Sequence, residues 1–174
     1  MPCSIRHHAA RIAAVALLLP GLAIDARADA ITDWNTKAGE IIVEAKLGTP
    51  PAIRVMALVQ TAAYEAVQAS RGGASAEAAV AAAHRATLVK LLPAQQAAIE
   101  AAYQVALTAI PEGPAKAAGI VIGERAAGTT LAQRASDSIT AETYRPHTTA
   151  GAYVPTATPA APTWSLRKTW QMTG

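Results

Sequence analysis

The chain has 174 residues, which suits one domain and is too short for two domains of ordinary size with a linker. Alanine accounts for 45 residues, phenylalanine is absent and only seven residues are aromatic, so the composition favours closely packed helices. Basic and acidic residues number 15 and 12, and the basic ones do not cluster, which argues against a nucleic acid as partner.

The first thirty residues have the pattern of a secretory signal peptide. Two arginines and two histidines form a basic start, the apolar run 12–23 follows, and A-x-A sites end at Ala28 and Ala30. The apolar run is shorter than the roughly 20 residues of a membrane-spanning helix. We therefore expect residues 1–30 to direct export to the periplasm or the medium and to be cleaved, leaving no membrane span. An ordinary N-terminal helix and an uncleaved anchor are the alternatives.

The single cysteine, Cys3, precedes the apolar run and would be removed with it. A mature chain without cysteine has no disulfide, no thiol nucleophile and no cysteine metal ligand. Its stability must therefore come from packing.

The spacing of apolar residues predicts an all-α domain over residues 31–137. Glycine and proline residues interrupt the pattern, and short loops favour antiparallel neighbours in an up-and-down helical array. The five expected helices are 33–46, 51–69, 75–92, 93–110 and 115–136.

The first two predicted helices differ in how their apolar residues are arranged. The first has Asp33 as its expected N-cap and is amphipathic. Its apolar face holds Trp34, Ala38, Ile41 and Ala45, and its solvated face holds Lys37, Glu40 and Glu44. The second has a broad apolar surface and one narrow polar stripe, so we expect it to be central and mostly buried.

Few residues are candidates for chemistry. Histidine is the usual general base or metal ligand, and His84 and His147 would remain after export. We interpret His84, on the apolar side of the third helix, as partly buried and hydrogen-bonded to a neighbouring helix. His147 lies in a predicted loop and is interpreted as a surface contact. Glu65 is expected to form a structural ion pair, with Arg54 and Gln68 as its neighbours in the polar stripe.

The sequence contains no H-E-x-x-H, carboxylate-x-x-His or cysteine pair for a metal, and no G-x-x-x-x-G-K-[ST], G-x-S-x-G or G-x-G-x-x-G segment. We therefore predict no catalytic, cofactor-binding or metal-binding residue in this chain. An enzyme complete in this chain would have to use His84, Glu65 or His147. Gly119 and Gly123 form a G-x-x-x-G pattern that, with the alanine-rich run 78–83, predicts the close approach of two helices.

After Asp137 the sequence changes character. Residues 144–163 are rich in threonine, proline and small residues and show neither helical nor alternating periodicity. We expect residues 138–174 to form an extended arm, ordered only where it lies across another surface.

Three segments resemble a known family. They are Ile31–Asn35 (ITDWN), Arg54–Val67 (RVMALVQTAAYEAV) and Glu142–Thr156 (ETYRPHTTAGAYVPT), the last continuing through Trp164 to Trp170. The third is the most specific, because helix-forming bias does not generate an irregular string containing G-x-Y-x-P-T. Together they resemble the N-terminal part of bacterial vanadium-dependent haloperoxidases and their relatives in the type 2 phosphatidic acid phosphatase superfamily.

The family's reactive centre lies in a later helical bundle, where K-x6-R-P, P-S-G-H and S-R-x5-H segments hold vanadate or phosphate. None of these segments is present here. Arg145 and Pro146 follow Ser138 rather than a lysine, Ser70 and Arg71 lead to Glu77 rather than a histidine, and no S-G-H occurs.

The resemblance therefore implies an N-terminal scaffold of a larger exported protein, truncated at about Gly174 before the catalytic residues. The vanadate cofactor would belong to the full-length protein, whose activity as a haloperoxidase or a phosphatase stays open. The partner implied is the missing catalytic bundle in cis, and this chain alone is expected to be inactive. The alternative is a stand-alone exported helical interaction or binding module without catalysis, and homo-oligomerisation stays open.

Overall fold

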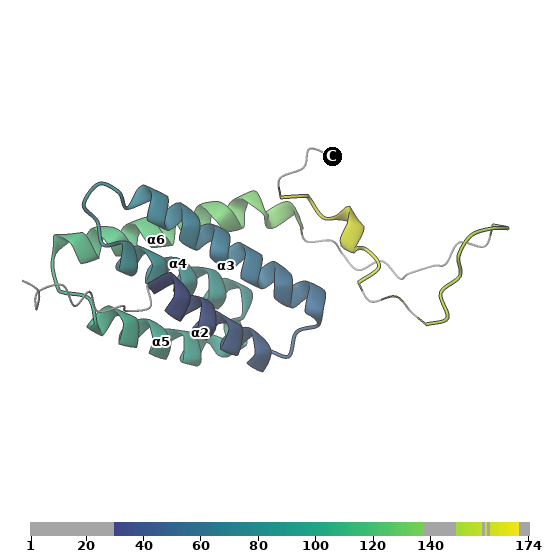
Figure 1. Ribbon diagram of the computed structural model, residues 1–174, viewed down its shortest axis with the longest axis horizontal. Helices are drawn as coiled ribbons and strands as arrows, with labels where there is room; N and C mark the ends of the chain where they lie inside the picture. Colours follow the sequence, from purple (N-terminus) through teal and green to yellow (C-terminus); the bar gives the residue numbers. More distant parts are fainter. Residues whose placement is uncertain (1–29, 138–148, 158, 160, 171–174) are drawn as a thin grey trace, which may run out of the picture.

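The computed structural model describes residues 30–137, 149–157, 159 and 161–170. Within these residues the protein has helices and turns and no strand, which confirms the all-α prediction (Figure 1). The helices are α2 (Ala30–Glu44), α3 (Thr49–Ala69), α4 (Ala76–Leu91), α5 (Gln96–Thr108) and α6 (Pro114–Gln133). Three 3₁₀ turns are η1 (Pro93–Gln95), η2 (Ala135–Asp137) and η3 (Trp164–Leu166). The predicted signal peptide, apart from Ala30, lies outside the described residues, as do Cys3 and His147.

Local sequence signals set most helix boundaries. The Ser75 hydroxyl accepts a hydrogen bond from the amide of Ala78 at 3.1 Å and so caps α4. Lys46 has a left-handed φ of 51° just after α2, which ends the helix before its predicted limit. Asp33 lies within the first turn of α2, so the N-cap prediction was wrong. Its carboxylate still interacts favourably with the helix dipole there.

The most buried helix is α4, not the second predicted helix. Every residue from Ala78 to His84 in α4 is buried, whereas Ile53 and Tyr64 on α3 are 62% and 60% exposed. The expectation that the second helix is the central one was therefore wrong. The physical reason is that α4 contacts α2, α3, α5 and α6, and alanine side chains allow helices to approach from several directions.

The predicted close approach of two helices occurs between α4 and α6 and is confirmed. A Cβ built on Gly119 would lie 2.4 Å from the Ser75 carbonyl oxygen, and one on Gly123 would lie 2.2 Å from that of Ala79. Both helices advance in the same direction along this contact, so α4 and α6 are parallel. Because Gly119 and Gly123 carry a hydrogen atom where alanine would carry a methyl group, the backbones of α4 and α6 are in direct contact at these positions.

The last helix packs mainly on α4 and α3 rather than on its sequence neighbour α5. Arg54 near the start of α3 contacts Asp137 just beyond α6, so α3 and α6 run antiparallel. Figure 1 shows α6 and α3 along the upper side of the bundle, with α2 and α5 along the lower side. The same view places residues 149–170 beyond the end of α6.

No helix in the described ranges is both long and apolar enough to cross a membrane.

Candidate functional site

The most elaborate polar contact of the described residues joins the end of α6 to the C-terminal arm. Arg134, which is 9% exposed, donates from Nη1 to the carbonyl oxygen of Thr169 at 3.0 Å and from Nη2 to that of Lys168 at 2.7 Å. Its guanidinium carbon lies 4.1 Å from the ring centroid of Trp170, which adds a cation–π contact. One buried side chain therefore fixes three consecutive residues of the arm.

A buried carboxylate organises the same junction. Asp137 is 2% exposed, and its Oδ2 lies 2.7 Å from Nε of Arg134 and 3.3 Å from Nη2 of Arg54. Arg54 also donates to the carbonyl oxygen of Arg134 at 3.2 Å. On the arm, Arg167 donates to the backbone oxygen of Asp137 and lies over the ring of Trp164. We call this set the arm junction: Arg54, Arg134, Asp137, Trp164, Arg167 and Trp170.

The sequence missed the arm junction because its members come from three separate parts of the chain: Arg54, residues 134–137 and residues 164–170. The predicted ion pair between Arg54 and Glu65 was wrong. Eleven residues on one helix span about 16 Å, so these two side chains cannot meet. Arg54 instead pairs with Asp137, and Glu65 is exposed, with no ion pair among the residues that the structure describes.

His84 is more deeply buried than predicted, and its hydrogen bond lies within its own helix. The side chain is fully buried, and Nδ1 lies 2.9 Å from the carbonyl oxygen of Val80. Its ring stacks on Trp34 of α2 with centroids 5.1 Å apart. Burial lowers the pKa of His84 from 6.5 to about 4, and the hydrogen bond to Val80 opposes this shift only in part. The imidazole is therefore neutral at physiological pH and acts as a core aromatic ring.

Arg85 ties three helices together at the surface. Its Nε lies 2.8 Å and 2.9 Å from the two carboxylate oxygens of Glu100, and its Nη1 lies 3.6 Å from Glu124. It also lies over the ring of Tyr103. The hydrogen bonds to Glu100 raise the pKa of Arg85, while burial raises that of the Tyr103 hydroxyl. The charge of Arg85 is paired with the carboxylates of Glu100 and Glu124, an arrangement typical of a cluster that stabilises the fold.

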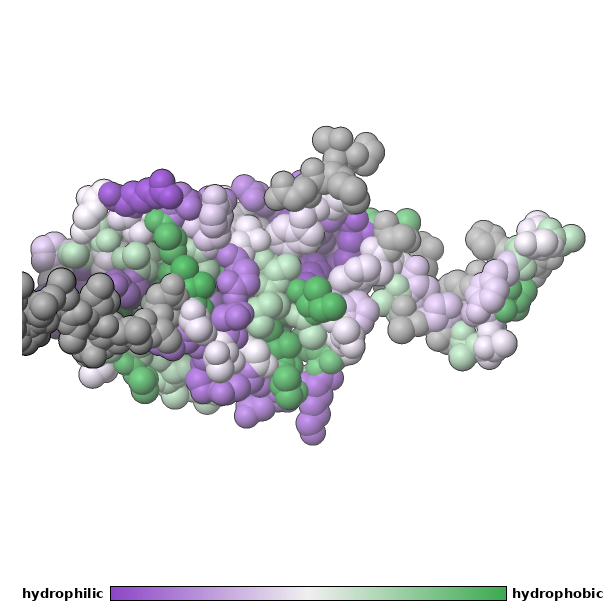
Figure 2. Space-filling model, viewed as in Figure 1, coloured by the Kyte–Doolittle hydropathy of each residue, from purple (hydrophilic) through white to green (hydrophobic). Residues whose placement is uncertain are grey.

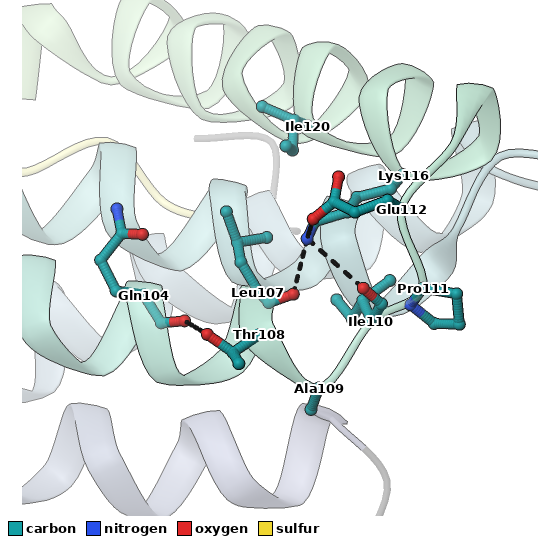
Figure 3. Close-up of a pocket in the computed structure, with 9 residues that line it drawn as sticks. All are labelled: Gln104, Leu107, Thr108, Ala109, Ile110, Pro111, Glu112, Lys116 and Ile120. Carbon is teal, nitrogen blue, oxygen red and sulfur yellow. Dashed lines mark hydrogen bonds and ion pairs between the residues drawn. The ribbon is translucent and has the colours of Figure 1, made fainter.

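An open depression of about 730 Å³ lies where α5 ends and α6 begins (Figure 3). Its charged centre is Lys116, whose ammonium donates to the carbonyl oxygens of Leu107 at 2.7 Å and Ile110 at 3.3 Å. Glu112 lies 2.5 Å from the same nitrogen. The lysine thus caps the C-terminal end of α5, and all three of its donors are used within the chain.

A second hollow, of about 570 Å³, is a groove between α2 and α5. Trp34, Ile41, Ala102 and Ala106 are its more buried apolar residues, while Ala98, Ala101, Val105 and Ala109 line it from the exposed side of α5. Charged side chains of α2 form its rim: Asp33, Lys37, Glu40 and Glu44. Lys37 and Glu40 pair with each other at 2.5 Å on the exposed surface, as the sequence pattern indicated.

Across the described ranges, no group of three or more histidine, cysteine or acidic side chains is arranged to hold a metal ion. No protein-family model, curated protein or solved structure matches the chain. The resemblance to vanadium-dependent haloperoxidases therefore stays a prediction carried by the sequence segments alone.

Proposed function

We propose that this chain is the N-terminal helical scaffold of an exported, vanadium-dependent haloperoxidase-like protein. In this proposal the helical bundle supplies packing surface, and the oxyanion-binding residues belong to a catalytic helical bundle in the same protein. Vanadate would be bound by that bundle and not by residues of this chain.

The observation that carries the proposal is the arm junction. Two of the three segments that resemble the family, residues 54–67 and the stretch from 142 to Trp170, are widely separated in the sequence. Arg54 from the first and Arg167 and Trp170 from the second meet around Asp137 and Arg134. Segments that resemble one family and converge on one contact are expected of a shared structural unit, which supports the proposal.

A direct test is to read the coding sequence after the codon for Gly174. We expect an open frame that encodes K-x6-R-P, P-S-G-H and S-R-x5-H in this order. A frame that continues without these segments would contradict the proposal.

The activity of the purified chain gives a second test. Residues 31–174 are expected to show no bromide-dependent peroxidase and no phosphatase activity, with or without added vanadate, while the product of the longer frame turns over when vanadate is added. Vanadate-dependent turnover by residues 31–174 alone would show that the reactive centre is not encoded elsewhere.

The second candidate is a stand-alone exported interaction module, which is favoured by the buried core of residues 30–137 and by the groove between α2 and α5. A cooperative melt of residues 31–174, together with a stop codon after Gly174, would support this candidate over the first.

A further inference from the structure

The bundle side of the arm junction holds the arm as a binding site holds a peptide. The Nη1 and Nη2 atoms of Arg134 donate to the backbone oxygens of Thr169 and Lys168, which are consecutive residues of the arm. A planar guanidinium that donates to two acceptors fixes the direction of the bound segment as well as its position. Every peptide has backbone oxygens, so this part of the contact recognises the main chain.

Two indole rings and one arginine of the arm give the contact its specificity. The ring centroid of Trp170 lies 4.1 Å from the guanidinium carbon of Arg134. Arg167 donates to the backbone oxygen of Asp137, and its guanidinium carbon lies 4.8 Å from the ring centroid of Trp164. Cation–π contacts are strongest with tryptophan. The three arm residues are three positions apart, so the segment that fits the site has the pattern W-x-x-R-x-x-W.

The arm takes no part in the apolar core. Within the described ranges, the two buried apolar clusters of the bundle contain no residue beyond Ala127. In the docked arm Leu166 is 71% exposed and Trp170 is 44% exposed. Figure 2 shows a mixture of hydrophilic and hydrophobic residues where the arm meets the bundle, rather than one continuous hydrophobic patch. Release of the arm therefore leaves the apolar core of residues 30–137 intact.

The arm carries its part of the contact within a short stretch of sequence. Three hydrogen bonds of 2.9–3.2 Å join backbone groups within residues 161–167 and involve no atom of the bundle. The two backbone oxygens, both rings and Arg167 all belong to residues 164–170. A separate peptide of this sequence thus contains each of these groups, and recognition does not require that the segment be covalently joined to the bundle.

We propose that the end of the bundle is a binding site for peptide segments of the W-x-x-R-x-x-W pattern, and that the chain's own arm occupies this site as an internal competitor. A tethered segment acts at an effective concentration of about 1 mM. A free segment therefore binds well only when the arm is weakened. The inference goes beyond the proposed function and does not rest on it, because a reading frame after Gly174 that contradicts the haloperoxidase-like assignment leaves the peptide site unaffected.

Fluorescence polarisation with a labelled synthetic peptide of residues 161–170 tests the site. The protein is the chain of residues 31–174, either unchanged or with its arm weakened by Arg167→Ala and Trp170→Ala together. Both substitutions lie in the arm, so the bundle side of the contact is the same in the two proteins. We expect the arm-weakened chain to bind the peptide about tenfold more tightly, because a competing arm at about 1 mM raises an intrinsic Kd of about 100 μM by that factor.

Variants of the peptide keep the protein constant and so separate recognition from folding. Trp170→Ala in the peptide removes the ring that lies over Arg134 and should weaken binding to the arm-weakened chain by about fivefold. Leu166→Ala in the peptide is the matched control and should bind unchanged, because this side chain is mostly exposed in the docked arm.

A substitution on the bundle side completes the test. Arg134→Lys in the arm-weakened chain keeps the positive charge but cannot donate to two backbone oxygens in the same way, so it should weaken the binding of the unchanged peptide by a similar factor. The proposal would be overturned by a peptide that does not bind the arm-weakened chain, that binds both forms of the chain equally, or that binds equally with and without Trp170.

Discussion

Replacing Gly123 by alanine tests the contact on which the bundle depends. The added Cβ would lie 2.2 Å from the carbonyl oxygen of Ala79, 2.8 Å from Cβ of Ala82 and 2.8 Å from the amide nitrogen of Ala83. Ordinary contacts of a Cβ are 3.4–4 Å. Two of the three atoms belong to the backbone of α4, so no side-chain rotation relieves the clash, and α6 must move away from α4 by about 1 Å.

The expected magnitude follows from two opposing effects. Alanine is favoured over glycine inside a helix by about 1 kcal/mol. Overpacking of a close contact costs about 1–3 kcal/mol, and a backbone clash belongs at the upper end of that range. We therefore expect the free energy of unfolding to fall by about 2 kcal/mol in Gly123→Ala.

Urea denaturation followed by far-ultraviolet circular dichroism measures this change. With a denaturant dependence of about 1.5 kcal/mol/M, the midpoint should fall by about 1.3 M. Gly128→Ala on the same helix is the matched control, because nothing lies within 4 Å of its added Cβ. This control should be stabilised by about 0.5–1 kcal/mol. If Gly123→Ala were as stable as Gly128→Ala, the close approach of α4 and α6 would be wrong.

Three further changes test separate parts of the structure. Because the pKa of His84 is lowered from 6.5 to about 4, the unfolded chain binds the extra proton between these values. The contribution of His84 to the free energy of unfolding is complete above about pH 6.5 and falls by about 3 kcal/mol toward pH 4. Urea denaturation at a series of pH values should show this loss of stability. The same loss in His84→Leu would contradict its assignment to His84. Lys116→Met leaves the carbonyl oxygens of Leu107 and Ile110 without their ammonium donor, so thermal melts should show a loss of about 1–3 kcal/mol. Arg134→Ala removes two hydrogen bonds and the contact with Trp170, so limited proteolysis should cut residues 161–170 several-fold faster while the bundle stays folded; unchanged cleavage would argue against the arm junction.

The sequence by itself determined the helices. Alanine-rich amphipathic runs and breaks at glycine and proline are local signals, so they predicted five helices whose limits lie within a few residues of those observed. The limits differ most, by three residues, at the start of α2, at the end of α6 and at the start of α5, where Pro93 begins a 3₁₀ turn and the helix starts only at Gln96. The G-x-x-x-G pattern also predicted a close contact, because two glycines four residues apart lie on one face of a helix and let the backbone of a second helix approach.

Only the tertiary structure decided which helices meet and which charges pair. Helix α4 is central because four other helices pack on its alanine-rich surface. The hydrophobic pattern of a single helix does not say how many other helices will contact it. Glu65 is an oppositely charged residue on the same helix as Arg54, but the partner of Arg54 is Asp137, 83 positions away. The arm junction and the groove are both made by elements that are distant in the chain, so their geometry exists only once the helices have packed.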